Sequence, residues 1–153
     1  MFYTLTSDHH CQVVALGCID FRFVKAMNDF IKEKIGTEKY DLITLGGTQK
    51  NLAAPANEDV KNFVLRQFEI SRSLHNTTQV FLIAHYDCGA YGGLAAFDND
   101  PEKERTKHVE DLYTAKQILL EKFPGLQIYL YRLDKNSTSN EIEFNEVKHI
   151  KPI

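Results

Sequence analysis

Two short segments of the sequence concentrate side chains that bind metal ions. Cys18 and His85 each lie at the end of an apolar run, residues 13–16 in one case and 80–84 in the other, and Cys88 follows three positions after His85. We interpret both runs as buried strands of a parallel sheet, whose carboxyl ends meet at one edge. Two thiolates and a neutral imidazole form a three-point ligand set for zinc. A set of three leaves the fourth position open, as in catalytic sites.

An acidic and a basic residue follow the first cysteine. On an extended chain the side chains of Cys18, Asp20 and Arg22 would point to one face, because residues two apart share a face. Ile19 and Phe21 would then point into the packing on the other face. Asp20 can either take the fourth position on zinc or be held away from it by Arg22 through a charge-assisted pair. In the second case Asp20 can orient a zinc-bound hydroxide toward an electrophile.

These two segments resemble the signature of the β-class carbonic anhydrases. The resemblance is carried by Cys18-Ile19-Asp20-Phe21-Arg22 and His85-Tyr86-Asp87-Cys88-Gly89-Ala90, and it extends more weakly over residues 13–94. It implies one Zn²⁺ per chain on Cys18, His85 and Cys88, with Asp20 and Arg22 as a catalytic dyad. It also implies reversible hydration of carbon dioxide to bicarbonate, and a homodimer or higher homo-oligomer with the site near the subunit interface.

The sequence departs from that family's pattern beside the site, and two other functions stay open. Phe21 replaces a small residue, and Leu45-Gly46-Gly47-Thr48 occupies the place of an Arg-x-Ala-Gly segment. One alternative is a hydrolase of carbon disulfide or carbonyl sulfide that uses the same constellation. The other is a non-catalytic, zinc-stabilised binding domain, in which Asp20→Ala would mainly lower thermal stability.

The elements that position these residues alternate along the chain. Apolar patterning predicts helices at 23–35, 58–75 and 103–123, and strands at 12–17, 41–45, 80–84, 126–133 and 142–147, the last at an edge. In the helix at 58–75, Val60, Phe63, Val64, Phe68 and Ile70 form the expected core-facing stripe. The pattern predicts a single α/β domain over residues 1–153, with a mainly parallel central sheet of four to five strands flanked by helices.

Several polar residues receive a structural rather than a catalytic interpretation. Asp8-His9-His10-Cys11 is interpreted as a polar lead-in to the first strand, in preference to a metal cluster. His75, His108 and His149 lie on stretches that we expect to be solvent-exposed. Asp87 is expected to stabilise its own turn by accepting backbone N–H bonds.

Composition excludes several classes of partner. The 153 residues carry a net charge of −3, which argues against nucleic acid or an anionic membrane surface as a partner. No apolar run reaches the length of a membrane span. The N-terminus does not have the pattern of a signal peptide, and three cysteines suit a reducing compartment, so we expect a cytoplasmic protein.

Overall fold

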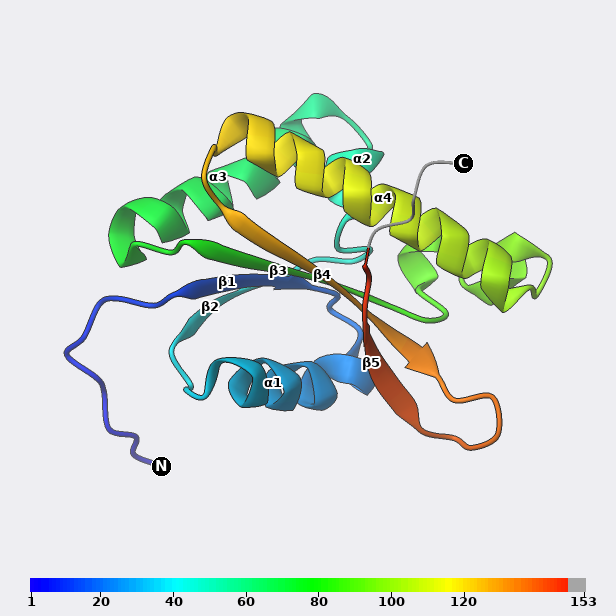
Figure 1. The fold of residues 1–153 in the computed structure, drawn as a ribbon, viewed down its shortest axis with the longest axis horizontal. Helices are drawn as coiled ribbons and strands as arrows, with labels where there is room; N and C mark the ends of the chain where they lie inside the picture. Colours follow the sequence, from blue (N-terminus) through cyan, green and yellow to red (C-terminus); the bar gives the residue numbers. More distant parts are fainter. Residues whose placement is uncertain (149–153) are drawn as a thin grey trace.

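The structure describes residues 1–148. These residues form a central five-stranded sheet with helices packed against it (Figure 1). In the computed structural model the strand order is β2-β1-β3-β4-β5. The parallel strands are β1 (Val13–Gly17), β2 (Tyr40–Thr44), β3 (Gln79–His85) and β4 (Gln127–Lys135), and β5 (Ile142–Glu146) pairs antiparallel with β4. The sequence prediction of an α/β fold with a mainly parallel sheet is therefore confirmed.

Helices cover both faces of this sheet. Helix α1 (Phe21–Ile35) lies on one face, and α2 (Lys50–Ala53), α3 (Glu58–His75) and α4 (Pro101–Lys122) lie on the other (Figure 1). Each face has its own apolar core. The core under α1 includes Val13, Ala15, Met27, Ile31, Phe81 and Ile83, and the opposite core includes Leu16, Leu52, Phe68, Leu82, Leu112 and Leu119.

Helix α1 begins earlier than the sequence predicts, and this changes the geometry beside Cys18. Asp20 is the N-cap, and its side chain accepts a hydrogen bond from the Arg22 backbone N–H at 3.0 Å. The chain therefore turns into a helix at Phe21 and does not stay extended. Ile19 and Phe21 are 63% and 87% exposed, so the prediction that they pack in the interior is wrong.

The other long helices begin and end at residues with clear capping roles. Asn57 caps α3 by accepting from the Val60 N–H at 3.0 Å, and α3 ends at Asn76, which is in the left-handed conformation. Asp100 caps α4, whose first residue is Pro101. Helix α3 has its predicted bounds, but Phe63 is exposed and not part of the core stripe. The short helix α2 was not predicted.

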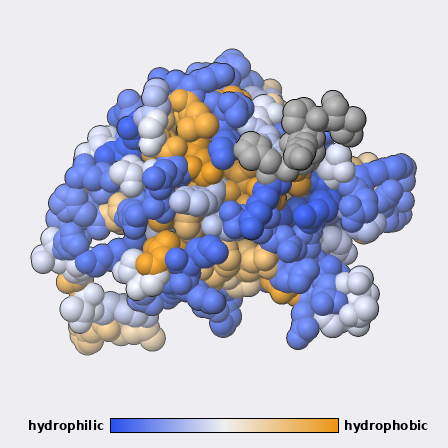
Figure 2. All heavy atoms as spheres, viewed as in Figure 1, coloured by the Kyte–Doolittle hydropathy of each residue, from blue (hydrophilic) through white to orange (hydrophobic). Residues whose placement is uncertain are grey.

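The face of the molecule drawn in Figure 2 is mostly hydrophilic. Figure 2 also shows smaller apolar patches between polar residues on that face. The large apolar side chains that are most exposed after residue 5 are Ile19, Phe21, Phe63 and Leu74. Within the described residues, no helix combines the length and the apolar character needed to cross a membrane.

Candidate metal centre

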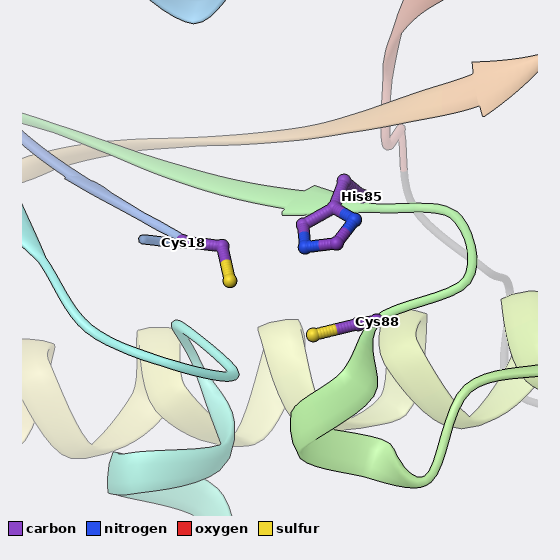
Figure 3. A group of neighbouring side chains, drawn as sticks. All are labelled: Cys18, His85 and Cys88. Carbon is purple, nitrogen blue, oxygen red and sulfur yellow. The ribbon is translucent and has the colours of Figure 1, made fainter. Parts of the chain in front are cut away.

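The topology brings Cys18, His85 and Cys88 together at the carboxyl edge of the two central strands. Cys18 follows β1 directly, His85 is the last residue of β3, and Cys88 precedes the 3₁₀ turn Gly89–Tyr91. Because β1 and β3 are paired and parallel, their ends deliver these side chains to one place. The three side chains point toward one another (Figure 3), and all are buried. One ligand atom from each lies within 4.8 Å of the other two.

The imidazole of His85 is oriented for metal binding. Its Nδ1 lies 2.7 Å from the backbone carbonyl oxygen of Tyr86. Because a carbonyl oxygen only accepts, Nδ1 carries the hydrogen and donates this hydrogen bond. The lone pair is then on Nε2, which faces the cysteines. Nε2 is buried and has no hydrogen-bond partner among the residues that the structure describes. An unpaired buried nitrogen is costly unless something binds it, and a metal ion would do so.

The two cysteine side chains interact with each other, and their thiol pKa values shift in opposite directions. The Cys88 thiol, the His85 side chain and the backbone N–H groups of Gly47 and Asp20 lie near the Cys18 sulfur and lower the pKa of the Cys18 thiol. The same interaction, together with burial, raises the pKa of Cys88. A divalent cation bound between the two sulfurs would draw the protons off both thiols.

The turn that donates to Cys18 depends on glycine. Gly47 has a φ of +81°, a region that favours glycine, and a Cβ there would lie 2.9 Å from the Cβ of Ala90. Both the backbone conformation and the limited space therefore favour glycine at position 47. Its proximity to the Cys18 sulfur could not be read from the sequence.

Asp20 pairs with Arg22 and stands outside the ligand group. The Arg22 Nε lies 3.0 Å from both carboxylate oxygens of Asp20, and Nη2 donates to Oδ2 at 2.6 Å. These bonds hold the pKa of Asp20 below its ordinary value. Of the two arrangements that the sequence left open, the structure has the one in which Arg22 holds Asp20 away from Cys18, His85 and Cys88.

Asp87 fixes Arg22 from the other side. The guanidinium of Arg22 donates to Asp87 Oδ2 at 3.2 Å and to the Asp87 carbonyl oxygen at 3.1 Å. The other carboxylate oxygen of Asp87 accepts from the Leu94 N–H at 2.9 Å, which confirms the expected role in its turn. Arg22 therefore links the start of α1 to the loop that carries Cys88. Sequence reasoning missed this link.

A buried ion pair supports the centre from α4 and β4. Glu104 accepts from the Cys88 backbone N–H at 3.3 Å and from Arg132 Nη2 at 2.8 Å. Both charged side chains are buried, and Arg132 also pairs with Asp134. Neither residue was predicted to contribute, because no local motif marks them. The only sequence signal is a glutamate on the face of α4 that also presents Val109 and Leu112.

The predicted exposure of the remaining histidines is partly wrong. His108 is buried against the ring of Tyr91, and burial lowers the pKa of His108 to about 3. His75 is half-buried and contacts Asp41. Both were expected on solvated stretches, but tertiary packing covers them. His149 lies outside the described residues.

The donor set fits a zinc ion. With ordinary bond lengths, ligand atoms of a tetrahedral Cys₂His site lie roughly 3.5–3.8 Å apart. The three ligand atoms already lie within 4.8 Å of one another, so only a small movement of the side chains is needed to reach these separations. The unpaired Nε2 of His85 and the lowered pKa of the Cys18 thiol favour the same ion. Cys18, His85 and Cys88 are thus the residues able to hold it, with one position left open.

Solved structures identify the fold. The chain superposes on a β-carbonic anhydrase of Trichomonas vaginalis with a TM-score of 0.55 and 13% identity, covering 94% of this chain and 87% of that one. For the β-carbonic anhydrase CafA of Aspergillus fumigatus the TM-score is 0.56 and the identity 18%, covering 94% and 78%. The fold is therefore that of the β-carbonic anhydrases.

Sequence comparison gives the family. Residues 8–143 match the family described as "Putative carbonic anhydrase", and the chain belongs to that family. Uncharacterized proteins of Rickettsia bellii and Rickettsia conorii are 27% and 26% identical over 140 residues, which are 90% of this chain and 85% and 75% of theirs. The resemblance noted from the two metal-binding segments is confirmed.

Proposed function

We propose that the protein is a zinc-dependent carbonic anhydrase that interconverts carbon dioxide and bicarbonate. The observation that carries this proposal is the buried, unpaired Nε2 of His85, which faces two cysteine sulfurs while Asp20 is held aside by Arg22. A three-ligand site with an adjacent carboxylate is the arrangement of a catalytic zinc. A structural zinc would need a fourth protein ligand, and Asp20 is engaged elsewhere.

In this proposal each residue beside the metal has a separate task. Zinc, when bound, is the Lewis acid that makes water nucleophilic near neutral pH. Asp20 accepts a hydrogen bond from the attacking water and so fixes the direction of its lone pair. Arg22 keeps Asp20 ionised and away from the fourth position on the metal, and Asp87 holds Arg22 in place. Water and carbon dioxide give bicarbonate and one proton, which passes to buffer.

A substitution of Asp20 that keeps the helix cap can separate an effect on turnover from an effect on folding. Asp20→Ala cannot do so, because Asp20 caps α1 and loss of a cap costs about 1 kcal/mol whatever the function. Asp20→Asn retains the cap but removes the charge. We expect this variant to bind zinc and to lose roughly 10²-fold or more of the hydration rate in a stopped-flow assay.

A matched control is available in α4. Asp100 is likewise a helix N-cap, lies outside the metal centre, and Asp100→Asn should leave the hydration rate unchanged. A zinc-loaded wild-type protein that shows no hydration between pH 7 and 9 would eliminate the enzyme. Turnover of carbonyl sulfide with no turnover of carbon dioxide would favour the alternative hydrolase.

We also infer a homodimer. The support is the pair of large apolar side chains, Ile19 and Phe21, that flank Asp20 and face solvent in the single chain. Exposed apolar groups beside a site mark surfaces that another chain covers. Light scattering of the purified protein tests this directly, and a monomer at micromolar concentration would contradict it.

A further inference from the structure

A second group of potential metal ligands lies at the amino ends of the parallel strands, whereas Cys18 lies at their carboxyl ends. Cys11 precedes β1, Asp41 is the second residue of β2, and His75 is the last residue of α3. One ligand atom from each lies within 4.8 Å of the other two. We propose that Cys11, Asp41 and His75 bind a second divalent metal ion, of the zinc class, independently of the centre at Cys18.

The three residues are fixed by the backbone of three different elements. The Cys11 N–H donates to the carbonyl oxygen of His75 at 3.1 Å, which ties the lead-in segment to the end of α3. Asp41 is in register with Val14 of β1. Because the sheet and α3 set these positions, the group is preorganised and needs no folding step to bind an ion.

A further residue orients the carboxylate. The buried Ser71 Oγ donates to Asp41 Oδ2 at 2.6 Å and lies 3.0 Å from Thr77 Oγ1. Supporting hydrogen bonds of this kind are typical around metal ligands, because they fix the direction of the donor atom. Both oxygens of Asp41 also lie close to His75 Nδ1, at 2.9 Å for Oδ1 and 2.8 Å for Oδ2.

The chemistry of the donors selects the ion. Sulfur, imidazole nitrogen and a carboxylate oxygen suit zinc better than magnesium or calcium, which take oxygen ligands. His75 Nδ1 lies 2.9 and 2.8 Å from the two oxygens of Asp41, so the two side chains already face each other. A divalent ion that binds there takes the place of this contact.

The group is reachable and its surroundings are rich in further donors. The side chains of His75 and Asp41 are 35% and 27% exposed. They line a cavity of about 450 Å³ that is also lined by Asp8, His9 and His10. One positive charge, on Lys39, lines the same cavity, and it pairs with Asp8 at 2.7 Å. A bound ion therefore meets no unpaired lysine, and water can take its fourth position.

A nucleophilic Cys–His–Asp triad does not explain this cluster. The Cys11 thiol donates to the Val13 carbonyl oxygen at 3.6 Å and is not hydrogen-bonded to His75 among the described contacts. Burial and the charge of Asp41 raise the pKa of Cys11 to about 11, whereas an activated cysteine needs a lowered pKa. The negative environment that disfavours a free thiolate is favourable for a cation.

Metal stoichiometry tests the proposal. Protein dialysed against zinc and then against metal-free buffer is analysed for zinc per chain by plasma mass spectrometry. We expect two ions per wild-type chain and one in Cys11→Ser/His75→Gln, with the hydration rate of that variant unchanged. His9→Gln, a histidine of the same cavity, is the matched control and should keep both ions. One ion per wild-type chain would overturn the proposal, as would two ions in Cys11→Ser/His75→Gln.

Cobalt substitution gives a second readout that does not depend on catalysis. In a Cys18→Ser/Cys88→Ser background, any thiolate-to-cobalt absorption must come from Cys11, and we expect it to vanish on adding His75→Gln. If that background fails to fold, the cobalt titration of wild type against Cys11→Ser/His75→Gln serves instead. Equal absorption in those two proteins overturns the proposal. Failure of carbon dioxide hydration would affect the centre at Cys18 only and leave this stoichiometry as it is.

Discussion

The buried pair of Glu104 and Arg132 permits a quantitative prediction. Glu104→Gln keeps an oxygen that can accept from the Cys88 N–H but removes the negative charge opposite Arg132. Breaking a buried ion pair on one side costs about 3–5 kcal/mol, because the other charge stays in the interior. Arg132 retains Asp134 as a partner, so we expect the lower end, about 3 kcal/mol. For a chain of this size that lowers Tm by roughly 6–12 °C.

Urea unfolding of the zinc-loaded protein measures this loss. Arg132→Met alone leaves Glu104 buried without its partner and should destabilise by a similar amount. The double variant Glu104→Gln/Arg132→Met removes both charges, so we expect its loss to be smaller than the sum of the two single losses by at least about 1 kcal/mol. Because Glu104 also fixes the loop of Cys88, zinc affinity in Glu104→Gln should fall about 10–100-fold in competition with a chelator.

Two results would refute this reasoning. One is a Glu104→Gln variant within about 0.5 kcal/mol of wild type, the range of ordinary surface substitutions. The other is strict additivity of the two single substitutions, which would mean that Glu104 and Arg132 do not act on each other.

Three further predictions concern the surroundings of the centre. His108 is neutral because its pKa is lowered from 6.5 to about 3, so its stabilisation is full above pH 6.5 and declines as the pH falls. In urea unfolding, the free energy of unfolding of wild type should fall between pH 7 and pH 5. In His108→Gln this fall should be smaller by about 2 kcal/mol. Gly47→Ala should lower the unfolding free energy by about 1–3 kcal/mol, whereas Gly46→Ala, whose Cβ would lie 3.9 Å from that of Ala90, should be nearly neutral. Phe21→Glu should convert a dimer to a monomer in light scattering, and an unchanged mass would place the interface elsewhere.

The sequence was sufficient to predict the fold and the meeting of three side chains. Cys18 and His85 end two continuous apolar runs, and such runs are typical of central parallel strands, whose carboxyl ends lie side by side. The two strands proved to be direct neighbours. Cys88 needed no separate argument, since a three-residue separation from His85 keeps it within reach.

Long-range contacts were beyond the reach of sequence patterns. The interpretation of residues 18–22 as extended failed because Asp20 is also a good helix cap, and the cap determined the local structure. His108 was expected at the surface because the sequence around it is charged, yet that part of α4 packs under Tyr91 and Arg132. Glu104 supports Cys88 from sixteen residues away, a relation that only the folded chain reveals.

The position of Cys18 and His85 on β1 and β3 has a consequence for how the protein handles its metal. Each of these strands has a hydrogen-bonded neighbour on both sides, so the carboxyl ends of β1 and β3 are held by the interior of the sheet. Demetallated protein should keep this scaffold, in contrast to zinc fingers, whose chains unfold when the ion leaves. Removal and rebinding of zinc would then change only the metal centre, and the far-UV circular dichroism spectrum should stay nearly the same.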